Sequence, residues 1–346
     1  LIRHARGDEP ADLLLRNGRV VNVLSGRVDD TSVALAGEFI VGLGDRPCRA
    51  EIDLDGAFVA PGFIDAHVHI ESALVPPAEF ARAVVPRGTT TVVADPHEIA
   101  NVLGLEGIRF MFESAKFGPL NMYVMASSCV PATALATSGA VLHGYDLFPL
   151  KSDPWVLGLA EVMNYHGVIG GDDAVLEKIG AFQDRVIDGH SPGLSGLALQ
   201  AYVAAGVQSD HESTTAGEAI EKLRLGMMVM IREGTVARDL AAIVPIVTPA
   251  NQHRFCFCTD DCQPADLLTR GGIDHAVRAA IALGMDPVSA IRLATWNPAQ
   301  HFRLHQRGAV TPGRRADLVV FDDIRAPRPR LVFRNGELMA RDGRMA

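Results

Sequence analysis

Two histidines separated by one residue, His67 and His69, are the clearest candidates for chemistry in this sequence. They close an apolar run, 62–69, that has the length and composition of a buried strand. Because successive strand residues point to opposite faces, both imidazoles lie on one face. Buried imidazoles need polar partners, and one shared metal ion satisfies both. The pattern predicts a metal site, although two core histidines bonded to carbonyl groups would have the same spacing.

Polar residues also stand at or just after the ends of several other apolar runs. They are Asp95 and His97 after 89–95, Glu161 after 155–161, His190 after 185–190, His211 after 205–211 and Asp260 after 254–260. A buried carboxylate such as Glu161 must pair with a cation or coordinate a metal ion. Imidazole and carboxylate ligands suit iron, manganese or zinc, and the sequence does not choose among them.

The elements that must position these residues are eight apolar runs that alternate with helical patterns. The runs are 62–69, 89–95, 121–126, 155–161, 185–190, 205–211, 226–232 and 254–260. Continuous apolar strands separated by helices indicate a parallel sheet that is buried on both faces. Eight such units predict an α/β protein with a (β/α)8 TIM-like barrel over 61–305, and an open doubly wound sheet is the alternative. In such a barrel the strand ends form the active-site face, so the polar residues would converge.

Both ends of the chain have the pattern of short strands. The segments are 12–21, 32–37 and 39–44 near the start, with 316–321 and 330–336 near the end. The pair Asn17-Gly18 predicts a tight hairpin. We expect residues 1–60 and 306–346 to pair into one small β-sandwich domain beside the barrel.

Composition narrows the class of protein. The net charge of −9 argues against a nucleic-acid surface, which needs a basic stripe. No apolar run reaches the roughly 18 residues that span a bilayer, so we expect no membrane partner. Five cysteines at irregular positions argue against a disulfide framework and favour the cytoplasm. Cys256, Cys258 and Cys262 could form a zinc cluster, but the first two fit better as small core residues.

Taken together, these motifs resemble the amidohydrolase superfamily and, within it, the adenine deaminase family. The stretches that carry the resemblance are PGFIDAHVHIES at 61–72, RGTTTVVADPHEIANVLG at 87–104, EVMNY at 161–165, DGHSPGLSG at 188–196, SDHE at 209–212 and CTDD at 258–261. They follow one another in the family's order and cover nearly the whole chain. The resemblance therefore implies a metal-dependent hydrolase that takes a small purine base.

The resemblance also implies a reaction and a ligand set. The reaction is hydrolytic deamination of adenine to hypoxanthine and ammonia, a step of purine salvage. Two divalent ions that share one water would lower the pKa of that water and supply hydroxide. The implied ligands are His67, His69, Glu161 and Asp260 around one ion, and Glu161, His190 and His211 around the other. Glu161 would bridge the two ions.

Further roles are assigned to polar neighbours of these ligands. Asp260 is the candidate for the first proton shuttle, while Glu212 and Asp261 would contact the base, relay protons or orient a ligand histidine. His97 would touch the substrate, bind an additional metal or form a hydrogen bond across the rim. The substrate-binding candidates are Glu71, Ser72, Asp95 and Glu98.

Two departures from the superfamily keep alternatives open. Many members bridge their metals with a carboxylated lysine, where this chain has Glu161, as the adenine deaminase family does. That family also continues into a further C-terminal domain, so the chain is expected to be truncated. The rivals are an amidohydrolase for a cyclic amide or another nucleobase, and a metal-binding relative without activity. Barrels of this superfamily often pair, so we expect a homo-oligomer.

Overall fold

The computed structural model describes residues 1–346. The chain divides into two compact units, each made of segments that are distant in sequence. One unit contains Leu1–Ile64, Ala81–Thr91 and Leu267–Ala346, and the other contains Asp65–Phe80 and Val92–Asp266. All candidate site residues belong to the second unit, so that unit alone must explain the site.

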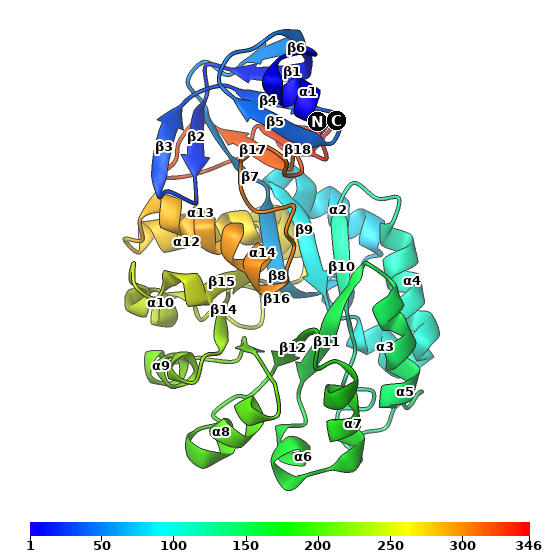
Figure 1. Cartoon of the computed structure of the whole chain (residues 1–346). Coiled ribbons are helices and arrows are strands. Elements are labelled where there is room, and N and C mark those ends of the chain that lie inside the picture. The colour runs from blue at the N-terminus through cyan, green and yellow to red at the C-terminus, as the bar shows by residue number, and fades with distance from the viewer. The chain divides into compact units, whose positions relative to one another are not determined.

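Strands at the eight predicted runs form two sheets with parallel pairing. They are β8 (Phe63–His69), β9 (Thr89–Ala94), β10 (Asn121–Ala126), β11 (Val156–Val162), β12 (Val186–Gly189), β13 (Ser209–Asp210), β14 (Met228–Arg232), β15 (Phe255–Cys258) and the short β16 (Asp260–Asp261). One sheet has the order β12-β11-β10-β9-β8-β16 and the other the order β13-β14-β15 (Figure 1). Strand pairs β10–β11, β11–β12 and β16–β8 are parallel, and so are those of the second sheet. The predicted α/β class is confirmed.

Two connections link these sheets at their margins. The backbone amide of Gln208, just before β13, donates to the carbonyl of Ile187 in β12 at 2.9 Å. At the other margin only Thr259 separates β15 from β16. Asp65 in β8 accepts hydrogen bonds from the amide and the hydroxyl of Thr259, at 3.0 and 2.6 Å. These bonds satisfy a carboxylate that is fully buried, and burial raises the pKa of Asp65 to about 7.

Helices follow most of these strands, as the alternating pattern predicts. They are α2 (Pro77–Val84), α3 (His97–Leu103), α4 (Leu105–Ala115), α5 (Gly144–Leu147), α6 (Tyr165–Gly170), α7 (Asp173–Ala181), α8 (Gly196–Ala204), α9 (Ala216–Arg224), α10 (Leu240–Ile243), α11 (Pro264–Thr269), α12 (Ile273–Ala282), α13 (Pro287–Leu293) and α14 (Trp296–His301). Turns of 3-10 helix are η1 (Ile70–Ala73), η2 (Val85–Arg87), η3 (Phe148–Ser152), η4 (Val244–Ile246) and η5 (Gln252–Arg254). No helix has both the length and the apolar character needed to cross a bilayer.

The first unit holds two further sheets and the short helix α1 (Ile2–Arg6). One sheet consists of β5 (Phe39–Leu43), β4 (Val33–Ala36), β1 (Ala11–Arg16) and β6 (Cys48–Asp53). The other consists of β20 (Arg344–Met345), β19 (Glu337–Arg341), β18 (Leu331–Arg334), β17 (Leu318–Phe321), β7 (Phe58–Pro61), β2 (Arg19–Asn22) and β3 (Arg27–Asp30). Because β7 pairs with β17, strands from both chain ends share one sheet (Figure 1). Buried side chains of both sheets, among them Leu35 and Phe333, belong to one hydrophobic cluster.

The hairpin predicted at Asn17-Gly18 is wrong. Strand β1 pairs with β4 and β6, whereas β2 pairs with β3 and β7, so the turn joins two different sheets. Asn17 adopts a left-handed conformation with φ 54°, as a tight turn requires. A side chain at Gly18 would approach Leu54 to 3.0 Å and Val59 to 3.3 Å. Asn17-Gly18 therefore does form a turn, as predicted. Packing of the strands in the hydrophobic core that contains Leu54 and Val59 decides which strands pair.

A buried ion pair joins α9 to Asp210, the last residue of β13 and the residue before His211. The Lys222 side chain is fully buried, and its Nζ lies 2.7 Å from Asp210 Oδ2 and 2.9 Å from Glu218 Oε1. We expect Lys222→Met to lower the free energy of unfolding by about 3–5 kcal/mol, because the buried Asp210 carboxylate loses its cation and keeps only neutral donors such as the Ser191 and Ser213 hydroxyls. Urea denaturation of the purified chain measures this. Lys116→Met, which breaks an exposed pair with Glu113, is the control. Equal effects of the two changes would contradict the assignment.

Candidate functional site

The two histidines of β8 meet at the end of the strand. Both side chains are buried, and their Nε2 atoms lie 3.1 Å apart. The Nδ1 atom of His69 lies 2.9 Å from the carbonyl oxygen of Asp95, which orients this imidazole with Nε2 toward His67. The strand alternation predicted for His67 and His69 therefore places two ring nitrogens at one point.

Glu161, in β11, lies between two pairs of histidines. Its Oε1 atom is 3.3 Å from His69 Nε2 and 4.0 Å from His67 Nε2. Its Oε2 atom is 2.6 Å from His190 Nδ1 and 3.2 Å from His211 Nε2. The two oxygens of one buried carboxylate thus face different imidazole pairs, which is the arrangement a bridging ligand needs.

Asp260 approaches the same histidines from β16. Its Oδ1 atom lies 3.5 Å from His67 Nε2 and 3.3 Å from His69 Nε2. The rings of His67 and His211 stack with centroids 4.0 Å apart. Asp260 has φ 56°, a left-handed conformation that few residues other than glycine adopt. Backbone strain of this kind collects at functional sites, and here it aims a carboxylate into the histidine cluster.

The carboxylates and imidazoles of the cluster shift one another's pKa values toward the charged forms. Burial alone would raise the pKa of the Glu161 carboxyl, but His190, His211 and His69 outweigh it and hold that pKa well below its usual range. Burial alone would lower the pKa of His211, but Glu161 and Asp260 raise it to about 9. Without a metal the imidazoles of His69 and His211, whose pKa values are both raised, keep their protons at neutral pH and partly neutralise the carboxylates. Metal binding must therefore displace protons from these rings.

The donor set fits divalent metal ions. Three groups of nitrogen and oxygen atoms, all within 4.8 Å of one another in each group, lie at the strand ends. The groups are His69, Asp95, His97 and Glu161; His67, His211 and Asp260; and Glu161, His190 and His211. Buried imidazoles and carboxylates of this kind suit iron, manganese or zinc. Cys256, Cys258 and Cys262 are buried and form no disulfide, and none of them belongs to these groups.

His97, whose role the sequence leaves open, lies within reach of Glu161. Its Nδ1 atom is 3.1 Å from Asp95 Oδ2 and 3.3 Å from Glu161 Oε1. Burial lowers the pKa of His97, but the Asp95 and Glu161 carboxylates outweigh burial and raise it to about 9. Asp95 is itself held by the Ser127 hydroxyl at 2.9 Å. His97 therefore contacts the central carboxylate directly.

Three of the four substrate-binding candidates make separate contacts near the cluster, and the fourth, Asp95, contacts His97. Glu71 accepts the amide of Ile99 at 3.3 Å, while Glu98 Oε1 lies 3.6 Å from His69 Nδ1. The second carboxylate oxygen of each is buried and has no hydrogen-bond partner. Burial, with the nearby Glu98 carboxylate, raises the pKa of Glu71 to about 7. The Ser72 hydroxyl donates to Asp261, which lies beside Asp260 in β16.

Sequence reasoning missed Arg232, which ends β14. Its guanidinium Nη1 binds Glu212 Oε1 and lies 3.3 Å from Asp260 Oδ2, while its Nε lies 2.9 Å from Asp239 Oδ2. Glu212 in turn lies 3.5 Å from His211 Nε2. A charged residue at the end of an apolar strand was the available signal. Arg232 connects Glu212 with Asp260 and so fixes both carboxylates.

We expect Arg232→Met to lower the rate of the deamination that the family resemblance implies by about 10- to 100-fold, while the metal content stays unchanged. Asp260 and Glu212 then lose the guanidinium that holds both of them in place. Steady-state kinetics together with metal analysis measures this. Arg238→Met is the matched control, since Arg238 is half exposed and pairs only with Asp266 among the acidic residues. Equal activity of the Arg232 variant and the control would contradict the positioning role.

Comparison with known proteins agrees with this geometry. The profile of the amidohydrolase family matches residues 58–339, so the chain belongs to the amidohydrolase family. An adenine deaminase of Kosmotoga olearia is 48% identical over 349 residues, which cover 100% of this chain and 60% of that relative. The chain thus spans about 60% of the length of the curated relatives it matches. The resemblance predicted from the sequence is confirmed.

Solved structures share the fold at low identity. The structure of an adenine deaminase has a TM-score of 0.70 and 18% identity, covering 95% of this chain and 99% of the other. A β-aspartyl dipeptidase of Fervidobacterium islandicum has a TM-score of 0.71 and 15% identity, covering 96% of this chain and 98% of the other. A deaminase and a peptidase resemble the chain equally well. Their likeness therefore supports the fold alone.

Proposed function

We propose that this chain carries the catalytic part of an enzyme that hydrolyses adenine to hypoxanthine and ammonia. The observation that carries the proposal is Glu161, whose two oxygens face His67 and His69 on one side and His190 and His211 on the other. The relatives of about 48% identity that bear the name adenine deaminase supply the substrate. Cytoplasmic purine salvage suits a chain whose five cysteines form no disulfide.

Two divalent ions are the proposed cofactors. His67, His69 and Asp260 would hold one, His190 and His211 the other, and Glu161 would contact both. When bound, such a pair activates water for attack at neutral pH. The fit rests on the donor set, in which buried imidazole nitrogens and carboxylate oxygens converge. Iron, manganese and zinc all suit these ligands.

The chain's own residues manage the protons of the reaction. The oxygen of one water adds to C6 of adenine, the bond from C6 to the amino nitrogen breaks, and ammonia leaves. Asp260 is the proposed general base. It takes a proton from the attacking water and passes it toward the nitrogens of adenine. Burial would raise the pKa of Asp260, but the imidazoles of His67 and His69 help hold it well below its usual range, so this side chain is an ionised carboxylate with no proton of its own. Glu212 and Asp261 are the proposed relays.

Binding of adenine is assigned to residues at the edge of the histidine and carboxylate cluster. The buried oxygens of Glu71 and Glu98 that have no partner would accept hydrogen bonds from N–H groups of adenine. Because the pKa of Glu71 is raised to about 7, this residue could also donate when it carries a proton. Ser72 and Asp95 would complete the pocket, and His97 would orient Glu161 or touch the substrate.

A closed barrel is the proposed architecture around this site. The Gln208–Ile187 hydrogen bond and the pairing of β16 with β8 support closure of the eight strands. The proposed domains are a barrel over 61–305 and a small β-sandwich formed by 1–60 and 306–346. The shared hydrophobic cluster of the two smaller sheets supports the sandwich. A homo-oligomer is the proposed assembly.

The test is conversion of adenine to hypoxanthine by the purified chain, followed by ultraviolet absorbance with iron(II) or manganese(II) present. We expect turnover that disappears in His67→Ala. Metal bound at the site without turnover would instead favour another substrate or a need for the remaining length of the relatives. A chain that binds no metal would contradict the proposal.

A further inference from the structure

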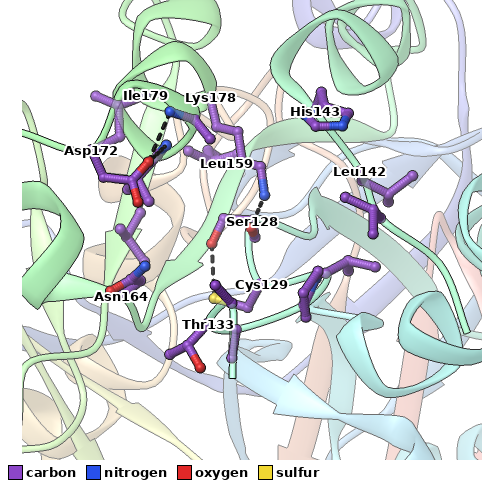
Figure 2. Close-up of a pocket in the computed structure, with 18 residues that line it drawn as sticks. Ser128, Cys129, Thr133, Leu142, His143, Leu159, Asn164, Asp172, Lys178 and Ile179 are labelled. Carbon is purple, nitrogen blue, oxygen red and sulfur yellow. Dashed lines mark hydrogen bonds between the residues drawn. The ribbon is translucent and has the colours of Figure 1, made fainter. Parts of the chain in front are cut away.

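A cavity of about 190 Å³ lies in the same unit as the candidate site and shares none of the proposed metal ligands. Its walls come from β11 and α7, from the loop 128–134 that follows β10, and from residues 141–143 just before α5 (Figure 2). Ser128 and Cys129 form part of its lining and donate to the backbone carbonyl of Glu161, at 2.5 and 3.0 Å. The cavity is therefore separate from the candidate site but touches its backbone.

A buried lysine gives the cavity a charge. Lys178 is 9% exposed, and Figure 2 shows it reaching from α7 to Ser128, whose carbonyl oxygen accepts its Nζ at 2.7 Å. No carboxylate lies within ion-pair distance of this amine, although an ammonium group offers three donors. Burial lowers the pKa of Lys178. An amine with a single neutral acceptor leaves donors unsatisfied, and a buried cation of this kind is costly without an anion.

The remaining lining is largely apolar. Leu142, Leu159, Val162 and Ile179 are buried in the walls. The only acidic lining residue is Asp172, which is exposed and accepts the amide of Ala174 at the start of α7, at 2.9 Å. Its repulsion of an anion at Lys178 is screened by solvent. The walls thus suit an apolar body, and the one buried charge suits an anion.

We propose that this cavity binds a small monocarboxylate with a compact aliphatic body, whose carboxylate pairs with Lys178. The volume has room for roughly six water-sized groups, which corresponds to an acid of the size of butyrate. The carboxylate satisfies the free donors of the amine and compensates its charge. The aliphatic part contacts the apolar walls, whose burial adds to the affinity.

The test is calorimetric titration of the metal-loaded chain with butyrate, and with butyramide as the neutral compound of matching shape. We expect saturable binding of one butyrate per chain, and binding at least about tenfold weaker for butyramide. Lys178→Met keeps an unbranched side chain but removes the charge, and it should weaken butyrate binding at least about tenfold. Lys116→Met, a change at an exposed lysine, should bind like the unchanged chain.

Three results would overturn the proposal. They are the absence of saturable butyrate binding, equal binding of butyramide, and undiminished binding by the Lys178 variant, which would place the carboxylate at the metal cluster instead. If Lys178→Met does not fold, Val175→Phe serves in its place. Val175 is half-buried on α7 and lines the cavity, so a larger side chain there should block butyrate. Unchanged binding by that variant would equally exclude this site.

Discussion

Replacing Glu161 with glutamine is expected to lower kcat/KM for adenine by at least about 10³-fold and to reduce the metal bound per chain. The carboxylate supplies one oxygen to each histidine pair, with His190 at 2.6 Å and His69 at 3.3 Å. Glutamine keeps the shape but replaces one oxygen by an NH₂ group, which donates hydrogen bonds and cannot bind a cation. Both sides of the cluster therefore lose a negative charge, and one side also loses its oxygen ligand.

The experiment combines steady-state kinetics with elemental analysis of dialysed protein. Glu113→Gln, at an exposed position on α4, is the matched control and should behave like the unchanged chain. A Glu161 variant that keeps its full metal content and most of its activity would show that this carboxylate is not a bridge. A variant that loses metal while the control keeps it would support the bridge.

Asp260→Asn is expected to lower kcat by about 10²- to 10⁴-fold with a much smaller change in KM, because the amide cannot take up the proton of the attacking water. The substitution is geometrically mild. Asn tolerates the left-handed conformation that residue 260 adopts at φ 56°, and its side-chain oxygen still reaches His67 and His69. The loss therefore reports on the carboxylate and not on a collapsed turn, and metal analysis of the variant separates its role as proton acceptor from its role as metal ligand.

Asp261→Asn is the control for this variant, since it makes the same change one residue later. Asp261 accepts the Ser72 hydroxyl and lies in none of the candidate ligand groups. We expect Asp261→Asn to lower kcat much less than Asp260→Asn does, because a proton relay or a contact to the adenine ring is not the first proton acceptor. If the two variants lose kcat equally, the proton role cannot be assigned to Asp260 alone. Circular dichroism of both proteins checks that they remain folded.

Much of the candidate site could be predicted because strand geometry is local. A residue spacing of two on a buried strand places His67 and His69 on one face, whatever the rest of the chain does. Parallel strands also bring their carboxyl ends to one edge, so Glu161, His190 and Asp260 could be grouped from their positions after apolar runs. The same patterns predicted the strands and helices that carry them.

Other features depend on contacts between distant segments. Arg232 ends an apolar strand like the ligands do, but only the fold shows that its guanidinium reaches both Glu212 and Asp260. The contact of His97, at the start of α3, with Glu161 in β11 joins two distant segments in the same way. Side-chain direction at strand ends and in loops follows from packing, and a sequence pattern does not encode it.

Motifs and periodicity were enough to predict the family, the alternation of strands and helices, and the residue types at the strand ends. They carry that information because they act within one element. The packing of distant segments, in contrast, determines that Asn17-Gly18 joins two sheets, that the two oxygens of Glu161 face opposite histidine pairs, and that Lys178 stands in an apolar cavity without an anion. These outcomes depend on how groups far apart in the chain are buried together. The free-energy cost of leaving a charge unpaired or a core unfilled determines which of them come into contact.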